Sequence, residues 1–452
     1  MPSTLIDWLS YLESLHPKTI ALGLERVAQV KQRLNLNPDF PVIVVGGTNG
    51  KGSVCAMLES ILHAAGYRVG CYTSPHLLHY NERVRIAKQQ VSDAELCASF
   101  EQIELARGDT PLTYFEFGTL AAMQLFIEKK IDVAILEVGL GGRLDAVNVF
   151  DTDCAVIASV DIDHTDYLGD TREQIAFEKA GIFRKGRVAV FGDEDMPAMI
   201  ASEAQRIGAE LWRLGLEFKF SRNNPSALKP PLTPPSQGES FSAPSLIREG
   251  WGGFGQWDYR SEVGSRNALP YPALRGAFQL NNASAVLAAL DALKDRLPVN
   301  MEAVRRGLVE VQLPGRFQLV PGQPTLILDV AHNPHAARSL AQNLAELPPC
   351  PHTYAVFAML KDKDMAGVAA ALGERIDTWL VAGIDSLRGA TAAELAQALK
   401  QGGVHGEVHT FANIAEALSY AYKAAGENDR IAAFGSFYTV AEVMTARGLR
   451  VL

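Results

Sequence analysis

A glycine-rich loop near the start of the chain most narrowly limits the folds that this sequence can adopt. An apolar run at residues 42–45 ends at the loop, and a helical pattern of apolar residues follows it over 53–67. A short buried strand, a tight glycine turn and a helix together are typical of a phosphate-binding βα unit. The sequence therefore predicts an α/β fold that begins with a nucleotide-binding unit.

The loop reads Gly-Gly-Thr-Asn-Gly-Lys-Gly-Ser over residues 46–53. Glycines let the backbone turn tightly enough for successive N–H groups to point at one anion, and the following helix adds its dipole. Lys51 would reach the terminal phosphates of a nucleotide. The strict Walker pattern is not met, because Val45 stands at its first glycine and Gly52 follows the lysine. A glycine-rich turn without a ligand is the alternative, but the strand–loop–helix context favours phosphate binding.

Short apolar runs and helical patterns alternate over most of the remaining chain, which is typical of βαβ units. We expect a helix at 281–293 and a connector with its own short helix at 297–313. Strands are expected at 133–136, 155–160 and 188–191 before the connector, and at 326–328, 354–357, 379–381 and 431–434 after it. The sequence thus predicts one domain over residues 1–297 and a second over 298–452, divided near Pro298.

This alternation breaks between residues 221 and 255, where 17 of 35 residues are Pro, Ser or Gly. Such a segment buries too little apolar surface to offset the entropy that it would lose on ordering. We expect a disordered surface insertion at about 221–255, and the sequence assigns it no function.

Charge and cysteine content argue against several classes of protein. The net charge is −9, from 42 basic and 51 acidic residues, so neither nucleic acid nor an anionic membrane is the expected partner. The five cysteines are scattered and form no Cys-x-x-Cys pair, so neither a zinc site nor a disulfide framework is expected. Because there is no signal-peptide pattern and no apolar run of membrane-spanning length, we expect a cytoplasmic protein, and a monomer by default.

Acidic residues stand where two of the predicted strands end. Glu137 closes the run 133–136, a position from which P-loop enzymes hold magnesium. Three aspartates and His164 follow the run 155–160, within residues 161–166. Together with the phosphate loop, these strand ends favour a cation site. The alternatives are solvated strand caps for the acids and a structural hydrogen bond for the histidine.

Three further groups are left undecided by local sequence. Lys179 precedes Gly181 at the end of a helical pattern, where a lysine usually complements the helix dipole. Arg316 lies in the connector, from which it could neutralise a transferring phosphoryl group. Asp329 ends a strand of the second domain and could accept a ribose hydroxyl. A structural ion pair and a strand cap are the alternatives for the last two residues.

The motifs, taken together and in order, resemble those of the folylpolyglutamate synthases. They lie at residues 47–53, 72–76, 81–83, 136–139, 163–166, 178–182 and 329–334. The resemblance covers nearly the whole chain apart from 221–255, and it favours the bacterial members that also make dihydrofolate. These enzymes are relatives of the Mur ligases of peptidoglycan synthesis. The resemblance implies an N-terminal P-loop NTPase-like domain of the Mur ligase central type and a smaller Rossmann-like C-terminal domain, with the reaction site between them.

The resemblance also implies roles for individual residues. Two magnesium ions would be held by Ser74, Glu137, His164 and Lys179, the lysine as a carbamate. ATP would be bound by Asn49, Gly50, Lys51, Gly52, Ser53, Asn282, Arg316 and Asp329. Asn282 would contact the adenine, and its neighbour Asn281 fits the same motif position. The residues implied in catalysis are Lys51, Arg316 and His332, the histidine as an orienting group.

A dihydropteroate pocket is implied as well. In the bifunctional members three segments form it, and they match Ile20, Ala21, Leu22, Gly23, Leu112, Thr113, Tyr114, Phe115, Leu144, Asp145 and Ala146. Tyr114 and Phe115 suit a flat pterin ring, and Asp145 can accept hydrogen bonds from its amino group. Ordinary core packing is the alternative for the two aromatic residues.

The implied function is that of an ATP-dependent ligase. It would add L-glutamate to dihydropteroate, making dihydrofolate, and to tetrahydrofolate and its one-carbon derivatives, making polyglutamates, through an acyl phosphate. The alternatives are a monofunctional folylpolyglutamate synthase, a Mur-type ligase for a UDP-sugar peptide, and a nucleotide-binding switch. The phosphate loop follows only 45 residues, which leaves no room for a preceding UDP-binding domain. The second α/β domain and Arg316 argue against the switch.

Overall fold

The computed structural model describes residues 2–16, 21–222 and 255–450 of the chain. Its contacts divide the chain into two compact units. The first contains residues up to 222 together with 256–271 and 280–311, and the second contains 272–279 and 312–450. The insertion expected at 221–255 falls almost entirely on 223–254, outside the described residues. Within the described ranges, no helix is long and apolar enough to cross a membrane.

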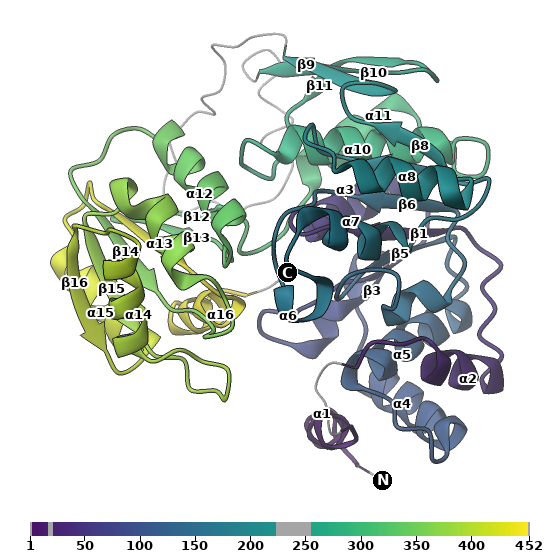
Figure 1. Ribbon diagram of the computed structural model, residues 1–452, viewed down its shortest axis with the longest axis horizontal. Helices are drawn as coiled ribbons and strands as arrows, with labels where there is room; N and C mark the ends of the chain where they lie inside the picture. The colour runs from purple at the N-terminus through teal and green to yellow at the C-terminus, as the bar shows by residue number, and fades with distance from the viewer. Residues whose placement is uncertain (1, 17–20, 223–254, 451–452) are drawn as a thin grey trace. The chain divides into compact units, whose positions relative to one another are not determined.

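A mostly parallel sheet forms the centre of the first unit (Figure 1), in the strand order β4–β3–β2–β5–β1–β6–β7–β8. Strands β2, β5, β1, β6, β7 and β8 run parallel to one another, so the loops after β2, β5, β1 and β6 leave from the same edge. The strands are β1 (Val42–Gly46), β2 (Val69–Tyr72), β3 (Val84–Ile86), β4 (Gln89–Gln90), β5 (Val133–Glu137), β6 (Cys154–Ile157), β7 (Val188–Phe191) and β8 (Glu210–Arg213).

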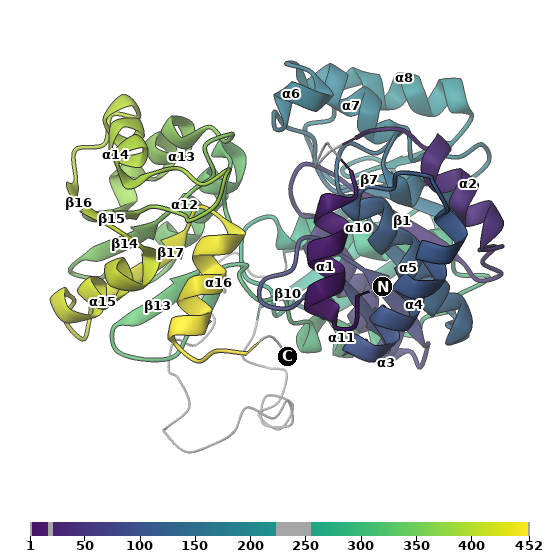
Figure 2. The same cartoon turned by 90° about the horizontal axis from the view of Figure 1, so that it is seen from below.

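Helices cover both faces of this sheet. Val42 and Val44 face a core that they share with residues of α5, α7 and α8. Ile43 and Val45 alternate with them and point to the other face, where α3 and α11 pack together. Figures 1 and 2 show α4 beside α5, and α7 beside α8. The helices are α1 (Leu5–Ser14), α2 (Glu25–Arg33), α3 (Lys51–Ala64), α4 (Asp93–Arg107), α5 (Tyr114–Glu128), α6 (Thr165–Leu168), α7 (Arg172–Ala180), α8 (Ala198–Ile207), α10 (Gln279–Ala292) and α11 (Met301–Glu310).

A small antiparallel sheet lies on α10. It is built from β9 (Phe218–Arg222), β10 (Gln256–Ser261) and β11 (Ser265–Pro270), in the order β11–β10–β9. Asp291 of α10 ties it down by accepting hydrogen bonds from the Tyr259 and Ser261 hydroxyls and pairing with Arg266 at 2.6 Å. Sequence periodicity did not predict this sheet, because its first and second strands flank the Pro/Ser/Gly-rich segment.

The second unit is a second α/β sheet, in the order β12–β13–β17–β14–β15–β16, with only β12 antiparallel to its neighbour. Helices α12, α13 and α14 share one core with the strands, and α15 and α16 pack together against β14, β15 and β17 (Figure 2). Its elements are β12 (Gln318–Val320), β13 (Thr325–Leu328), α12 (Pro334–Glu346), β14 (Thr353–Phe357), α13 (Met365–Leu372), β15 (Thr378–Ala382), α14 (Ala392–Gln401), β16 (Glu407–Phe411), α15 (Ile414–Ala424), β17 (Arg430–Phe434) and α16 (Phe437–Ala446).

The predicted α/β class is confirmed. The domain boundary expected near Pro298 stays a prediction. The chain forms α11 after that proline, and α11 packs against α3 of the first unit. The compact first unit consequently extends to Val311. The helical pattern at 297–313 was recognised correctly, but its apolar face does not reveal which unit it covers.

Candidate active site

The predicted phosphate loop joins β1 to α3. Gly47 and Gly50 have φ angles of 145° and 84°, and a Cβ at Gly50 would lie 2.7 Å from Oδ1 of Asn282. Both positions therefore need glycine, and Asn282 of α10 lies directly beside the loop. No side chain caps the N-terminus of α3. Its first-turn N–H groups and its dipole are suited to an anion.

Hydrogen bonds to the residues after β6 hold this loop in place. The Thr48 N–H donates to the carbonyl of Ser159 at 2.8 Å, and the Thr48 hydroxyl bonds the N–H and the C=O of Asp161, both at 3.0 Å. Lys51 folds over the loop, and its Nζ donates to the carbonyls of Gly47 and Thr48 at 3.0 and 3.3 Å. The loop therefore has a fixed shape with an ammonium group directly on it.

Ser74 and Glu137 lie next to each other because β2 and β5 are parallel neighbours. The Ser74 N–H donates to Oε2 of Glu137 at 3.0 Å, and Glu137 is only 5% exposed. A carboxylate and a hydroxyl at strand ends beside a phosphate loop are the hard oxygen donors that magnesium prefers. These two residues fit the predicted cation site.

His164 is held in a left-handed conformation at the N-terminus of α6, with φ of 53°. Its N–H donates to Oδ1 of Asp163 at 2.8 Å. Non-glycine residues adopt this conformation rarely and often at functional sites. Asp166 of the same acidic motif is exposed. Among the described residues no three His, Cys, Asp or Glu side chains are grouped as a metal site, and the implied ligand set contains only two of these residue types, Glu137 and His164.

Lys179 is buried at the end of α7, with 4% of its surface exposed. Burial, aided by the positive charge of Lys51, lowers the pKa of its amine to about 7, against the opposing charges of Asp163 and Asp145. The structure thus brings Lys179 within electrostatic reach of the phosphate-loop lysine. A buried amine of this kind differs from the solvated helix-end lysine that local sequence suggested.

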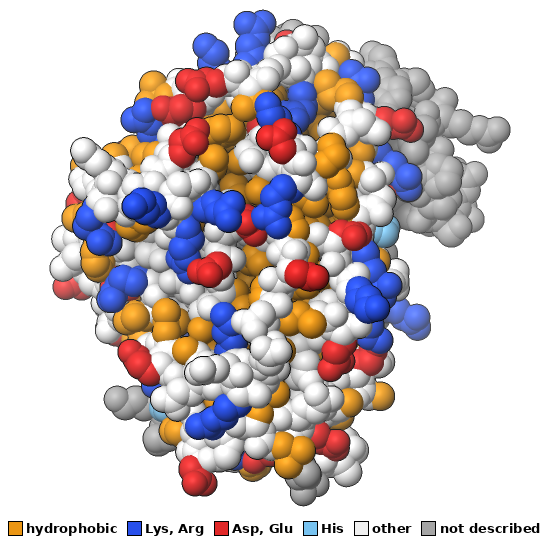
Figure 3. Space-filling view, turned by 90° about the vertical axis from the view of Figure 1, so that its right-hand side faces the viewer, with side chains coloured by type: hydrophobic (Ala, Val, Ile, Leu, Met, Phe, Trp, Pro, Cys, Tyr) orange, Lys and Arg blue, Asp and Glu red, His pale blue; other side chains and the backbone are white. Residues whose placement is uncertain are grey.

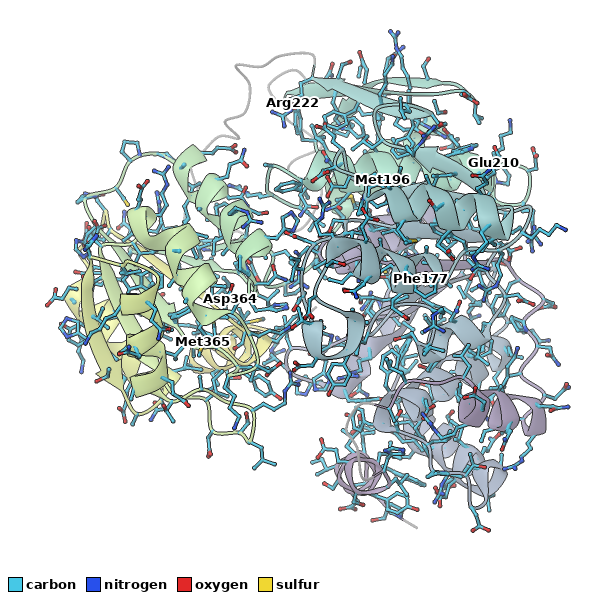
Figure 4. The ribbon with its side chains drawn as sticks, viewed as in Figure 1. Phe177, Met196, Glu210, Arg222, Asp364 and Met365 are labelled. Carbon is cyan, nitrogen blue, oxygen red and sulfur yellow. The ribbon has the colours of Figure 1, made fainter. Side chains whose placement is uncertain are left out.

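The short segment 137–145 connects several of these groups. Asp145 accepts from the N–H of Leu140 at 2.8 Å. Arg143 donates its N–H to the carbonyl of Glu178 at 2.7 Å and pairs with the carboxylate of the same residue at 2.7 Å. Its guanidinium also lies 5.4 Å from the ring centre of Phe177, which is labelled on α7 in Figure 4. The segment therefore fixes the end of the helix that carries Lys179.

Asp145 is the best-defined member of the implied pterin pocket. It is 4% exposed and accepts a second backbone N–H, from Val147, at 3.1 Å. Burial raises the pKa of its carboxyl to about 7, although the backbone N–H groups and Lys51 oppose this shift. The N–H of Gly23 donates to the carbonyl of Leu144 at 3.4 Å, which brings two of the implied segments together.

The remaining pterin residues divide into two groups. Tyr114 and Phe115 lie in an aromatic cluster, where Phe115 contacts Tyr72 at 5.7 Å between ring centres and the Arg83 guanidinium lies 5.4 Å from the ring centre of Tyr114. The residues of the other group cap a helix, are wholly or partly buried, accept a backbone-anchoring hydrogen bond, or lie outside the described residues. Thr113 caps α5, Leu112 and Ala146 are buried, Ala21 accepts a hydrogen bond from Arg26, Leu22 is half-buried, and Ile20 lies outside the described residues.

Arg316, Asp329 and His332 come together in the second unit. Asp329 accepts the N–H groups of Phe317 and Ala331 at 2.8 and 2.7 Å. Burial raises the pKa of its carboxyl, and the charge of Arg316 opposes the shift. Nδ1 of His332 lies 2.8 Å from the carbonyl of Val330, and because a carbonyl oxygen only accepts, this nitrogen is the donor.

Phe437, which sequence analysis did not single out, joins this group. The Arg316 guanidinium lies 5.1 Å from its ring centre, and the His332 ring lies 6.3 Å away. An aromatic residue directly after a strand and a Gly-Ser turn, at the start of α16, was the only available signal. Ser159, which holds the phosphate loop, had an equally weak signal as a polar residue near the end of β6.

Family models match both units. The Mur ligase middle domain matches residues 45–230, and the Mur ligase, glutamate ligase domain matches residues 315–437. A dihydrofolate synthase/folylpolyglutamate synthase of Escherichia coli (strain K12) is 45% identical over 443 residues, covering 98% of this chain and 95% of the relative. The protein of the same name from Haemophilus influenzae is 41% identical, with 97% of each chain covered.

Solved structures give the same result. E. coli FolC in complex with DHPP and ADP has a TM-score of 0.88 and 44% identity, with 99% of each chain covered. A bifunctional folylpolyglutamate synthase/dihydrofolate synthase with Mn, AMPPNP and L-glutamate bound has a TM-score of 0.86 and 47% identity, covering 99% of this chain and 98% of that one. The fold, its motifs and these comparisons show that the chain belongs to the dihydrofolate synthase/folylpolyglutamate synthase family of Mur ligases.

Proposed function

We propose that this protein is an ATP-dependent ligase that joins L-glutamate to dihydropteroate, making dihydrofolate, and to tetrahydrofolates, making their polyglutamates. The observation that carries the proposal is the set of groups along one edge of the first sheet. The phosphate loop, Lys51, Ser74 and Glu137 all follow neighbouring parallel strands. The full-length similarity to bifunctional synthases supports both acceptors.

The reaction would run through an acyl phosphate, because a free carboxylate has no adequate leaving group. Lys51 and the first-turn N–H groups of α3 would hold the β- and γ-phosphates, and Arg316 would offset charge on the transferring group. Ser74, Glu137, His164 and Lys179, the last as a carbamate, would hold the divalent ions. When bound, these ions would neutralise phosphate charge that otherwise repels an anionic nucleophile.

Substrate placement is the second task of the proposed site. Asp145 would accept hydrogen bonds from the pterin amino group, and Tyr114 and Phe115 would flank the ring. Asn282 would contact the adenine, and Asp329 would bind the nucleotide in the second unit. His332 would serve as an orienting group. We also propose that the protein acts as a monomer.

The decisive experiment measures ADP release with dihydropteroate and tetrahydrofolate as alternative acceptors, each with and without L-glutamate. We expect release only when an acceptor and glutamate are both present, with formation of the corresponding amide. Release without either would instead identify an ATPase or a switch. Activity with tetrahydrofolate but not with dihydropteroate would identify a monofunctional synthase. If neither acceptor is used, a UDP-sugar peptide is tested as a third acceptor, and activity with it would identify a Mur-type ligase.

A further inference from the structure

A buried ion pair links α3 to strand β3. Arg85 of β3 and Glu59 of α3 are bonded through Nη2 and Oε2 at 2.8 Å, and Nε of the arginine lies 3.1 and 3.0 Å from the two carboxylate oxygens. The exposed fractions of the side chains are 17% and 6%. On the face shown in Figure 3, by contrast, acidic and basic side chains are interspersed at the surface. Burying both charges costs free energy that an apolar pair would avoid, so stability alone does not explain this pair.

Every donor of the Arg85 guanidinium is used. Besides Glu59, it donates from Nη1 to the hydroxyl of Thr73 at 3.2 Å and to the carbonyl of Glu82 at 2.8 Å, and from Nη2 to Sγ of Cys71 at 3.4 Å. A guanidinium has five N–H donors in a rigid plane, and here they bind the helix, the end of β2 and the turn before β3. Lysine, with three donors on one atom, cannot replace this arrangement.

The segments that Arg85 joins lead directly to the cation site. Thr73 immediately precedes Ser74, whose N–H donates to Glu137. The Glu82 carboxylate accepts from the N–H groups of residues 77, 78 and 79 at 2.8, 2.7 and 2.6 Å, so the loop after Ser74 is fixed as well. On the other side, Glu59 lies about two turns after Lys51 on the same helix.

We infer that Arg85 and Glu59 are positioning residues, which set the Ser74–Glu137 cation ligands in register with the phosphate-loop helix. The inference rests on the proposed function, because it takes Ser74 and Glu137 as cation ligands. Neither residue is among the proposed nucleotide or cation ligands. The pair acts by fixing the distance between the end of β2 and α3. The cation ligands Ser74 and Glu137 are then held at the right distance from the phosphate loop to bind the cation and the phosphate at the same time.

The test compares Arg85→Lys and Glu59→Gln with Arg266→Lys, a matched change in the buried Arg266–Asp291 pair, whose side chains are 18% and 4% exposed. Manganese binding in the presence of ADP is measured by electron paramagnetic resonance, and the magnesium dependence of ligation is measured separately. We expect the Arg85 and Glu59 variants to bind manganese about 10- to 100-fold more weakly, as is typical when partners of metal ligands are changed. KM for the pterin acceptor should stay within about twofold, and excess magnesium should restore part of kcat.

The control variant should lose stability without a change in manganese affinity. If the Arg85 variants melt early but bind manganese as the parent protein does, the pair is merely structural and the inference is wrong. Should Arg85→Lys fail to fold, Thr73→Val removes one acceptor of the same guanidinium and must show the same weakening. If the parent protein itself binds no manganese with ADP, the proposed function fails, which is a different result from unchanged affinity in the variants.

Discussion

Gly50 approaches Asn282 so closely that a Cβ atom on it would lie 2.7 Å from the Oδ1 of the asparagine. The contact joins the phosphate loop to α10, two elements that are far apart in the sequence. Position 50 therefore needs glycine for two reasons: its φ is 84°, and there is no space for a Cβ atom beside Asn282.

Gly50→Ala should therefore weaken nucleotide binding beyond the effect of backbone strain. Gly215→Ala is the matched control, because Gly215 has a φ of 87° and nothing within 4 Å of its added Cβ. We expect both variants to lose about 1–2 kcal/mol of unfolding free energy through strain. Only Gly50→Ala should also raise the Kd for ADP, measured by calorimetry. Equal Kd values for both variants would show that the crowding beside Asn282 does not matter.

Lys51→Ala should abolish ligation and leave the fold intact. The Lys51 Nζ bonds two loop carbonyls, so its removal costs little stability. Without its positive charge beside the transferring phosphoryl group, kcat should fall by about 10²- to 10³-fold. Lys185→Ala, which changes an exposed lysine of the same unit, serves as control. A folded Lys51→Ala protein with full activity would contradict the assignment of the phosphate loop.

Lys179 should carry a carbamate in bicarbonate buffer. Only a neutral amine adds carbon dioxide, and because burial and Lys51 lower the pKa of this amine to about 7, the neutral form increases as the pH rises through that value. ¹³C-bicarbonate should give a carbonyl signal that grows between about pH 6 and pH 8. The signal should be absent from Lys179→Ala. A fully active protein with a persistently free amine at this position would remove the claim.

Asp145 predicts a pH dependence of stability. Burial raises the pKa of its carboxyl from 3.8 to about 7, so between these values the folded protein holds a proton that the unfolded chain has lost. The contribution of this group is therefore largest below pH 3.8, and stability falls as the pH rises through about 7, by at most about 1.4 kcal/mol per pH unit. With Asp145→Asn, the denaturation midpoint should depend less on pH over this range, and KM for dihydropteroate should rise. An unchanged slope would show that the carboxyl titrates normally.

Phe437→Leu should weaken ATP binding through Arg316. The ring holds the guanidinium at 5.1 Å, and a contact of this kind is worth about 1 kcal/mol, or roughly a fivefold rise in KM for ATP. Tyr422→Leu removes a similar ring, at 4.5 Å from Arg447, and should leave KM unchanged. If the two variants behave alike, Phe437 does not position Arg316.

Much of this fold could be predicted from the sequence because the buried parallel strands are nearly continuous apolar runs. Residues 42–45, 133–136 and 188–191 all lie in observed strands, and the helix expected at 281–293 is α10. Strands β9, β10 and β11 were missed because they are mixed in polarity and because β9 and β10 flank the Pro/Ser/Gly-rich segment. The sequence also does not show that α11 packs against α3, because an amphipathic helix does not indicate which neighbour it covers.

The part of the candidate site that could be predicted is the phosphate loop, because its glycine pattern and lysine lie between a strand and a helix in the sequence itself. The environment of Lys179 could not, since its burial depends on the segment 137–145 packing against α7. Phe437 and the Arg85–Glu59 pair were missed for the same reason. Their partners lie on other elements of the fold, and a single sequence contains no signal for contacts between distant segments.

The segment 137–145 has a practical consequence for anyone who wishes to redesign the acceptor range of this enzyme. Glu137 at its start is the proposed cation ligand, and Asp145 at its end is the proposed hydrogen-bond partner of the pterin. Arg143, between them, holds the helix that carries Lys179. Changes there would disturb phosphoryl chemistry along with acceptor choice. New acceptor preferences should therefore be sought first at Tyr114, whose ring lies beside Arg83 and outside this segment, because Gly23 and Phe115 both contact residues 137–145.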